Sequence, residues 1–240
     1  MSKKGIINLQ FWSGDRAQAM DVARLIANIE PRHRDEYDFM FSARWDAEHH
    51  ANTIRDVSCK FNVFTCKTKT HASGWPLGCN YLWLESMHAI YRRIKSGELP
   101  RYKWVLTLEN DDCPLTRDWL DRLDESFSSM NMAVVGNVVP YPKHHVNGNC
   151  LFTTAPEFMD FILGIRKLPK VGWDYFLADR FRWWGWADIP EIRSIWGTRT
   201  AQPNLLEQYV SAGVKMLHGV KDGSAIRWAK HNLTGSGRLG

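Results

Sequence analysis

The alternation of short apolar runs with segments of helical periodicity constrains the fold of this chain more than any other feature. Runs rich in β-branched and aromatic residues predict strands at residues 5–12, 37–43, 61–66, 104–108 and 132–139. Apolar residues at helical spacing predict intervening helices at residues 16–29, 47–57, 81–95 and, with Thr116 as N-cap, from Trp119 onward. Strands that alternate with helices need crossover connections, so we predict an α/β fold with a mainly parallel sheet and helices on both faces.

Three carboxylates follow directly after the fourth predicted strand: Glu109, Asp111 and Asp112. Ligands of open α/β sheets bind outside the carboxyl ends of the strands. Carboxylates this close together repel one another unless a cation neutralises them, and oxygen ligands suit Mg²⁺ or Mn²⁺. The alternative is an acidic turn that only solvates a loop and caps a helix. Pro114 should prevent any further strand pairing.

Length and composition narrow the class of protein. A chain of 240 residues is long enough for one large α/β domain or two small ones. No apolar run approaches the ~20 residues that cross a bilayer, and we interpret the N-terminus as a first strand rather than a signal peptide. The five cysteines are widely spaced without a CxxC motif, which argues against zinc and fits a reducing cytoplasm. A net charge of +5 favours polyanionic partners such as nucleotides or nucleic acid.

The order of these parts resembles the GT-A fold of nucleotide-sugar-dependent glycosyltransferases. The resembling residues are 109–112 (ENDD), an ExD variant of the acidic motif of that fold, and His218. The His218 loop, LHGVKDG, is similar to that of the late metal-binding histidine in retaining members such as the glycogenin-like group. Their loop has the spacing His-x-x-Gly-x-x-Lys, whereas here Gly219 follows the histidine directly. The resemblance implies a single GT-A-type domain with a nucleotide-sugar-binding half and an irregular acceptor-binding half, at residues 1–112 and 113–240.

The resemblance also implies a divalent metal, Mn²⁺ or Mg²⁺, held against the diphosphate of a donor, with UDP-sugar the expected one. Asp111 and Asp112 are the expected ligands, Glu109 is a ligand or a partner of the ribose, and His218 is the remaining protein ligand. Lys221 is expected to support the leaving oxygen, which gains negative charge. For His218 and Lys221 the alternatives are a loop histidine bonded to a backbone carbonyl and an ordinary surface lysine.

Candidate donor contacts lie at or just beyond the ends of the first two predicted strands, where the resembled fold holds base, ribose and pyrophosphate. They are Trp12, Arg16, Ser42, Arg44 and Asp46. An arginine there can face the pyrophosphate with two parallel hydrogen bonds. Later in the chain, the pair Gly78 and Asn80 opens a helix whose free N–H groups suit a phosphate or a ribose hydroxyl. A helix cap or an exposed charge remains the alternative for each of these residues.

The acceptor half offers two candidate regions. Asn147, Gly148 and Asn149 match in position the segment that faces the donor sugar and acceptor in the resembled enzymes, although Asn-Gly is also a strong turn signal. Asp174 is the candidate general base or sugar contact. An inverting enzyme needs such a carboxylate near the acceptor hydroxyl and a retaining enzyme does not, so the stereochemistry stays open at this point.

The tryptophans and the basic residues in the second half of the chain indicate what kind of acceptor to expect. The neighbouring indoles of WWGW cannot all point into one core, so we expect Trp184 or Trp186 to line the acceptor site. The layout is also similar to small enzymes with which some viruses glycosylate hydroxymethylated pyrimidines in their DNA, in the host cytoplasm. Modified DNA is therefore the first expected acceptor, and a glycan, lipid or protein is the second. Cations that suit a phosphate backbone are Arg166, Lys167, Lys170, Arg180, Arg182, Arg193, Arg199, Arg227, Lys230 and Arg238.

Two other classes of protein remain as alternatives. A nucleotidyltransferase shares the Rossmann-like half and the metal, but it would usually carry a glycine-rich signature near the first strand, whereas FWSGDR holds one glycine. A non-enzymatic DNA-binding module would be expected to show a helix-turn-helix or zinc-finger pattern, and the sequence has neither.

Overall fold

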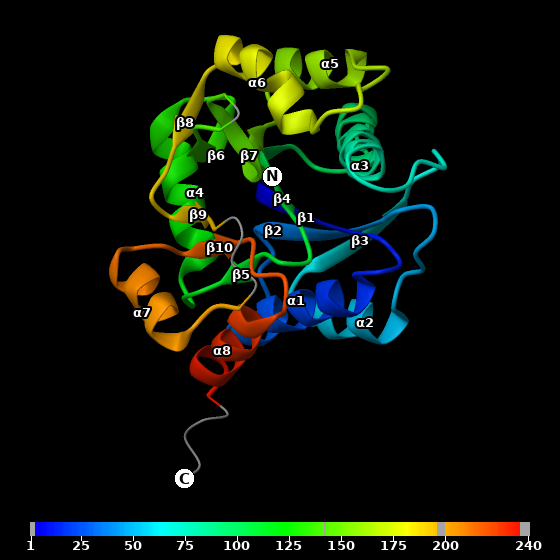
Figure 1. Ribbon diagram of the computed structural model, residues 1–240. Coiled ribbons are helices and arrows are strands. Elements are labelled where there is room, and N and C mark those ends of the chain that lie inside the picture. The colour runs from blue at the N-terminus through cyan, green and yellow to red at the C-terminus, as the bar shows by residue number, and fades with distance from the viewer. Residues whose placement is uncertain (1–2, 142, 196–199, 236–240) are drawn as a thin grey trace.

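A seven-stranded sheet forms the centre of the protein (Figure 1). The computed structural model describes residues 3–141, 143–195 and 200–235. Neighbouring strands pair in parallel except β7, which is antiparallel to both β4 and β6. The predicted α/β fold with a mainly parallel sheet is confirmed. In spatial order the strands are β3 (Asn62–Lys67), β2 (Tyr37–Ala43), β1 (Lys3–Phe11), β4 (Tyr102–Leu108), β7 (His145–Thr153), β6 (Val134–Val139) and β8 (Trp186–Asp188).

Helices cover both faces of this sheet, as predicted (Figure 1). Alternate residues of β1 enter different cores: Ile7 and Leu9 pack with α1, whereas Ile6 packs with Trp83 of α3. Each such fully buried side chain contributes about 1.5–3 kcal/mol. The helices on the first face are α1 (Arg16–Ile29), α2 (Ala51–Ser58), α4 (Trp119–Met130), α7 (Pro203–Ser211) and α8 (Ser224–Leu233), and those on the second are α3 (Leu77–Ser96), α5 (Pro156–Gly164) and α6 (Trp173–Trp184).

A second, three-stranded sheet lies beside the end of β4. Its strands, in order, are β5 (Cys113–Pro114), β10 (Met216–His218) and β9 (Ile192–Ser194). The prediction that Pro114 stops strand pairing is wrong, because this residue pairs with Met216. Proline lacks a donor but keeps its carbonyl, and the N–H of the following Leu115 donates to Lys215 at 2.8 Å. This pairing brings His218 next to the residues that follow β4.

Several element boundaries differ from the sequence prediction. The polar stretch 144–149, predicted to be turn-prone, forms most of β7. Helix α4 begins after Asp118 rather than at Thr116, whose hydroxyl donates to the Asp118 carboxylate at 2.6 Å. Within the described ranges, no helix is both long and apolar enough to span a bilayer. Trp196, Arg199, Arg238 and the tail from residue 236 lie outside the described residues.

Candidate functional site

A cluster of charged side chains forms where β4 and β10 end. Glu109, Asp111 and His218 each place a ligand atom within 4.8 Å of the others. His218 Nε2 lies 3.5 Å from Asp111 Oδ1 and 3.6 Å from Glu109 Oε2, and Lys221 Nζ contacts Asp111 Oδ2. We call these four residues the carboxyl-edge cluster. The structure therefore brings together residues that are more than a hundred positions apart in the sequence.

Asp111 is the most constrained member of this cluster. It is 1% exposed, and the groups that the structure places against its two oxygens are His218 Nε2 at Oδ1 and Lys221 Nζ at Oδ2. Burial raises the pKa of Asp111, but the nearby charges of His218 and Lys221 outweigh burial and hold the pKa well below its usual range. Burial lowers the pKa of His218, and the surrounding carboxylates outweigh this and raise it.

This donor set fits a divalent cation. Two carboxylates and an imidazole converge on one point, and oxygen and imidazole donors suit Mn²⁺, with carboxylates suiting Mg²⁺ as well. Among the described residues, the buried oxygens of Asp111 meet charged side chains and no backbone N–H group. A cation at this point would satisfy them.

Asp112 does not belong to the cluster, although the sequence predicts it as a metal ligand. Its Oδ2 accepts the backbone N–H of Glu109 at 2.6 Å, and its Oδ1 accepts from Asn149 Nδ2 at 3.0 Å. The carboxylate is completely buried, and burial raises its pKa to about 7. Because both oxygens are engaged, Asp112 shapes the turn after β4 rather than facing a ligand.

The asparagines of β7 lie behind the cluster and not on a sugar-binding surface. Asn147 Nδ2 lies 3.1 Å from His218 Nδ1 and donates to Ser194 Oγ at 2.5 Å. Asn149 and Asn147 are 1% and 2% exposed, so the expected direct contacts with a sugar are not formed by these side chains. Gly148 permits a close approach, since a Cβ there would lie 3.3 Å from the Trp173 ring.

The residues predicted to contact a donor lie at the ends of β1 and β2 and at the start of α1. Arg44 forms two hydrogen bonds to Asp46, at 2.7 and 2.6 Å, and its guanidinium lies 4.8 Å from the centre of the Trp12 ring. Trp12 remains 42% exposed. A Cβ at Gly78 would lie 2.7 Å from Arg44 Nη1, so glycine at the start of α3 makes room for this guanidinium. Arg16 is exposed at the start of α1.

Two predicted donor contacts are buried instead. Ser42 is completely buried, and its hydroxyl donates to Asn8 Oδ1 at 2.6 Å. Asn80 is also completely buried: it donates to the carbonyls of Pro169 and Val171 and accepts the N–H of Trp173 at 2.9 Å. The expectation that they contact a nucleotide is therefore wrong. Asn80 instead fixes the loop that leads into α6.

A cavity of about 790 Å³ adjoins the cluster on its other side. Asp174, in the first turn of α6, lines it, and His145 Nε2 lies 3.7 Å from Asp174 Oδ2. Burial raises the pKa of Asp174. Ser194, which bonds to the β7 asparagines, connects this cavity to the cluster. We call it the aromatic cavity, after its residues Trp75, Tyr141 and Tyr175.

Trp184 and Trp186 are not among the residues that line the aromatic cavity, and the expectation that one of them lines an acceptor site stays a prediction. Trp184 packs on Phe158 and Phe161, with ring centres 5.6 and 5.9 Å apart. Trp186 pairs with Val134 at the amino end of β6. The length of α6 explains the position of Trp184. Asp174 lies near the cluster, and Trp184 follows it ten residues later, which corresponds to about 15 Å along a helix.

Sequence reasoning missed Asp15 and, apart from Asp174, the residues that line the aromatic cavity. Asp15 accepts the backbone N–H of Trp12 at 2.8 Å, and burial raises its pKa to about 7, with Glu109 and Asp111 adding to the effect. The sequence shows it only as a turn residue. Trp75 stands in a loop rich in glycine and proline, and no local pattern distinguishes it from other exposed tryptophans such as Trp183.

Comparison with known proteins gives a likeness of fold. No protein-family model matches the chain, and no curated protein is similar to it in sequence. Similar solved structures are the apo WbbM bifunctional glycosyltransferase (12% identity, TM-score 0.55, 90% of this chain and 45% of that one), S. aureus TarS 1–349 (9%, 0.51, 78% and 58%) and apo GlyE, a glycosyltransferase in Streptococcus pneumoniae (10%, 0.52, 92% and 55%). The chain spans about half the length of these proteins. It has the mixed α/β fold of these glycosyltransferases.

Proposed function

We propose that this protein is a metal-dependent glycosyltransferase that moves a sugar from a nucleotide-diphosphate sugar, UDP-sugar, to a hydroxyl acceptor. The observation that carries this proposal is the convergence of Glu109, Asp111 and His218 at the carboxyl edge of the sheet. The strand order β2-β1-β4-β7 supports it, because this order sets the cluster between Arg44 and the aromatic cavity. A donor and an acceptor can then meet at the cluster.

On the donor side, Trp12 offers an exposed ring to a base or ribose. Arg44 is buried and bonded twice to Asp46, so it supports the Trp12 ring and adds positive charge beside it. A divalent cation held by Glu109, Asp111 and His218 would stabilise the negative charge of the departing diphosphate as a Lewis acid. Lys221 contacts the carboxylate of Asp111, and its side chain is 57% exposed. It supplies a further positive charge to the diphosphate oxygens.

On the acceptor side, Asp174 acts as the general base. The acceptor oxygen forms a bond to the anomeric carbon while the bond to the diphosphate breaks, and the hydroxyl proton passes to Asp174. Its raised pKa favours this transfer, and His145 at 3.7 Å supports the carboxylate from behind. The nucleoside diphosphate leaves on the opposite face, so the anomeric configuration inverts.

The aromatic cavity suits an acceptor with a flat ring. A volume of about 790 Å³ accommodates one or two rings, and Trp75 and Tyr141 are exposed for stacking. A glycan acceptor is favoured over modified DNA because several predicted DNA contacts are engaged within the chain. Arg193 donates to the carbonyls of Ile189 and Ile192, and Lys230 pairs with Asp21. A hydroxymethylated pyrimidine flipped into the cavity is the second acceptor.

A panel of UDP-sugars with Mn²⁺ tests the activity. A glycosyltransferase hydrolyses its donor slowly without acceptor and releases UDP, whereas a nucleotidyltransferase releases pyrophosphate when given a sugar phosphate and a nucleoside triphosphate. Oligosaccharides, plain DNA and hydroxymethylated DNA then identify the acceptor by the mass added. The protein has a different function if no donor is bound or hydrolysed in the presence of metal.

Substitution of the base separates donor chemistry from transfer. Asp174→Asn should lower transfer about 10²- to 10⁴-fold while donor binding persists. Asp179→Asn is the matched control, because this carboxylate lies on the same helix but is exposed and paired with Lys143. Equal activity of the Asp174 variant and the unaltered protein would rule out the assigned base and reopen the retaining mechanism.

A further inference from the structure

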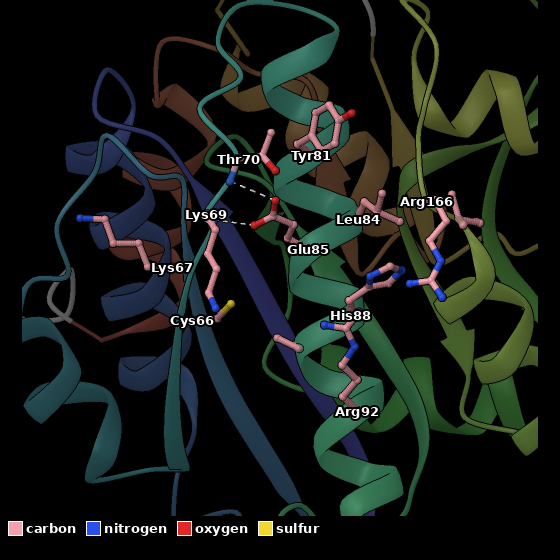
Figure 2. A pocket seen from close by; sticks show the side chains of 12 residues that line it. Cys66, Lys67, Lys69, Thr70, Tyr81, Leu84, Glu85, His88, Arg92 and Arg166 are labelled. Carbon is pink, nitrogen blue, oxygen red and sulfur yellow. Dashed lines mark hydrogen bonds between the residues drawn. The ribbon is translucent and has the colours of Figure 1, made fainter.

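A second cavity, of about 480 Å³, lies along α3 (Figure 2), and its lining contains no residue of the carboxyl-edge cluster or of the aromatic cavity. One wall is β3 with the loop that follows it, represented by Cys66 and Lys69. Helix α3 forms the floor, and Arg166, just beyond α5, closes the third side. Three segments that are distant in sequence therefore meet around one space. We call it the α3 cavity.

Positive charge dominates the lining of the α3 cavity. Lys69, Arg92 and Arg166 form no ion pair with any residue that the structure describes. Glu85 is the carboxylate in the lining, and it is already engaged: it accepts the backbone N–H groups of Lys69 at 2.5 Å and of Thr70 at 3.1 Å (Figure 2). The cations therefore outnumber the carboxylates in the lining, and Glu85 offsets only part of their charge.

The charges of two of these cations, Arg92 and Arg166, both affect the ring of His88. It is 9% exposed, and Nε2 lies 2.9 Å from the carbonyl of Ile162, which only accepts, so Nε2 carries the hydrogen. Burial lowers the pKa of His88, and the guanidiniums of Arg92 and Arg166 lower it further. Figure 2 shows Arg166 beside the His88 ring, with Arg92 one turn further along α3.

Like charges held together from separate elements cost free energy unless an anion offsets them. A guanidinium presents a planar fork of donors that matches the oxygen atoms of a phosphate, and two forks can hold one phosphate from two sides. Tyr81 and Leu84 extend the lining beyond the cations and offer a surface for the rest of a small molecule. The volume lies within the range of small-ligand pockets.

We propose that the α3 cavity binds the phosphate group of a small phosphate ester. Arg92 and Arg166 hold the phosphate oxygens, Lys69 adds charge from the loop after β3, and Glu85 limits the depth to which the anion enters. This site is separate from the donor site at Arg44, and it does not depend on the proposed sugar transfer.

Calorimetry with inorganic phosphate and with glycerol 3-phosphate, in EDTA so that no metal site contributes, tests the proposal. We expect saturable binding, weakened about tenfold or more by Arg92→Gln or by Arg166→Gln and lost in the double variant. Arg122→Gln is the charge-matched control: this arginine lies on α4, on the other face of the sheet, paired with Asp118 and Glu125. These exposed substitutions leave both cores intact, and circular dichroism verifies folding.

Three results would overturn the assignment. They are no saturable binding by the unaltered protein, equal weakening by Arg122→Gln, and loss of binding through Arg44→Gln with the two α3-cavity variants unaffected, which would place the phosphate in the donor site. A single-stranded thymidine oligonucleotide serves as the polymer arm. If it binds through Arg92 while neither small probe binds, the cavity belongs to a nucleic-acid surface and the small-ligand proposal fails.

Discussion

Two groups of buried charges lie at opposite edges of the central sheet, and they differ in how completely they are satisfied. At the amino edge, before β2, Arg34 donates to Glu30 at 2.7 Å, to Glu36 at 2.9 Å and to Asp121. The second oxygen of Glu30 accepts from Trp119 Nε1 at 3.2 Å. Arg34 is 5% exposed and Glu30 is 1% exposed. We call these residues, Arg34 and its three carboxylate partners, the amino-edge cluster.

The carboxyl-edge cluster contains the same kinds of charge in a different state. Asp111 is as buried as Glu30, yet among described residues its oxygens meet two cationic side chains, His218 and the more than half-exposed Lys221, and no neutral donor such as the Trp119 indole. The aromatic cavity adjoins this edge, whereas the amino-edge carboxylates are held together by Arg34. Burial of charge therefore does not mark a functional site by itself. We expect buried charges to mark one where they lie beside a cavity and the chain leaves their hydrogen bonding incomplete.

Removing one charged group at each edge separates function from stability. Asp111→Asn should abolish binding of Mn²⁺ and lower sugar transfer by about 10³-fold, since the charge at a metal site is worth several kcal/mol to the transition state. The free energy of unfolding should fall by about 1–3 kcal/mol, less than at the amino edge, because Lys221, which loses its ion pair, is more than half exposed and can be solvated. Calorimetry with Mn²⁺ and a denaturant titration measure the two quantities. A large loss of stability would mean that both clusters are structural.

The converse substitution is Arg34→Gln. It leaves the buried Glu30 carboxylate without its ion pair, so the free energy of unfolding should fall by about 3–5 kcal/mol. Binding of Mn²⁺ by the folded protein should be unchanged. Arg32→Gln is the matched control, because Arg32 pairs with Glu36 at the surface with its side chain 65% exposed, and exposed pairs contribute about 0–1 kcal/mol. Similar losses in both variants would contradict the contrast between the two edges.

The sequence predicts the sheet and the position of the acidic turn because both depend on local patterns. Strand β4 is a short run of β-formers, and Glu109 and Asp111 follow it directly. The contribution of His218 was predicted from the resemblance to a family, since no local pattern joins it to β4. The prediction that Pro114 stops strand pairing is wrong because a proline removes only the N–H donor of a strand pair. Its neighbours still pair with β10 and with Lys215 just before it.

The side of an element on which a polar residue lies was the least predictable property. Ser42 and Asn80 carry the hydrogen-bonding groups that a nucleotide site needs, but both are completely buried and satisfied by the chain. A buried amide that fixes a loop and an exposed amide that binds ribose look the same in sequence. Neighbouring indoles in one element occupy different faces, but this rule does not give the direction of Trp184, which α6 carries away from the aromatic cavity.

Substitution of Asn80 tests whether a buried residue, whose amide already forms its hydrogen bonds within the chain, affects catalysis at the carboxyl edge of the sheet. Its amide bonds Pro169, Val171 and Trp173, and so places the first turn of α6 that carries Asp174. Asn80→Ala should lower kcat about 10²-fold through a small displacement of the base, with the KM for the donor unchanged. Asn52→Ala, an exposed asparagine of α2, is the control. An unchanged kcat in the Asn80 variant would contradict this positioning role.

The smallest expected effect compares two exposed tryptophans. Trp75 lines the aromatic cavity and is 80% exposed, and Trp183 is 77% exposed near the end of α6. Neither substitution should change stability by more than about 0.5 kcal/mol, since little surface is buried by either ring. Trp75→Ala should raise the KM for the acceptor about tenfold through the loss of ring stacking, whereas Trp183→Ala should not. Initial rates at saturating donor measure both. An equal effect of the two variants would show that the acceptor binds outside the aromatic cavity, and the functional surface of the carboxyl edge would then end at the cluster itself.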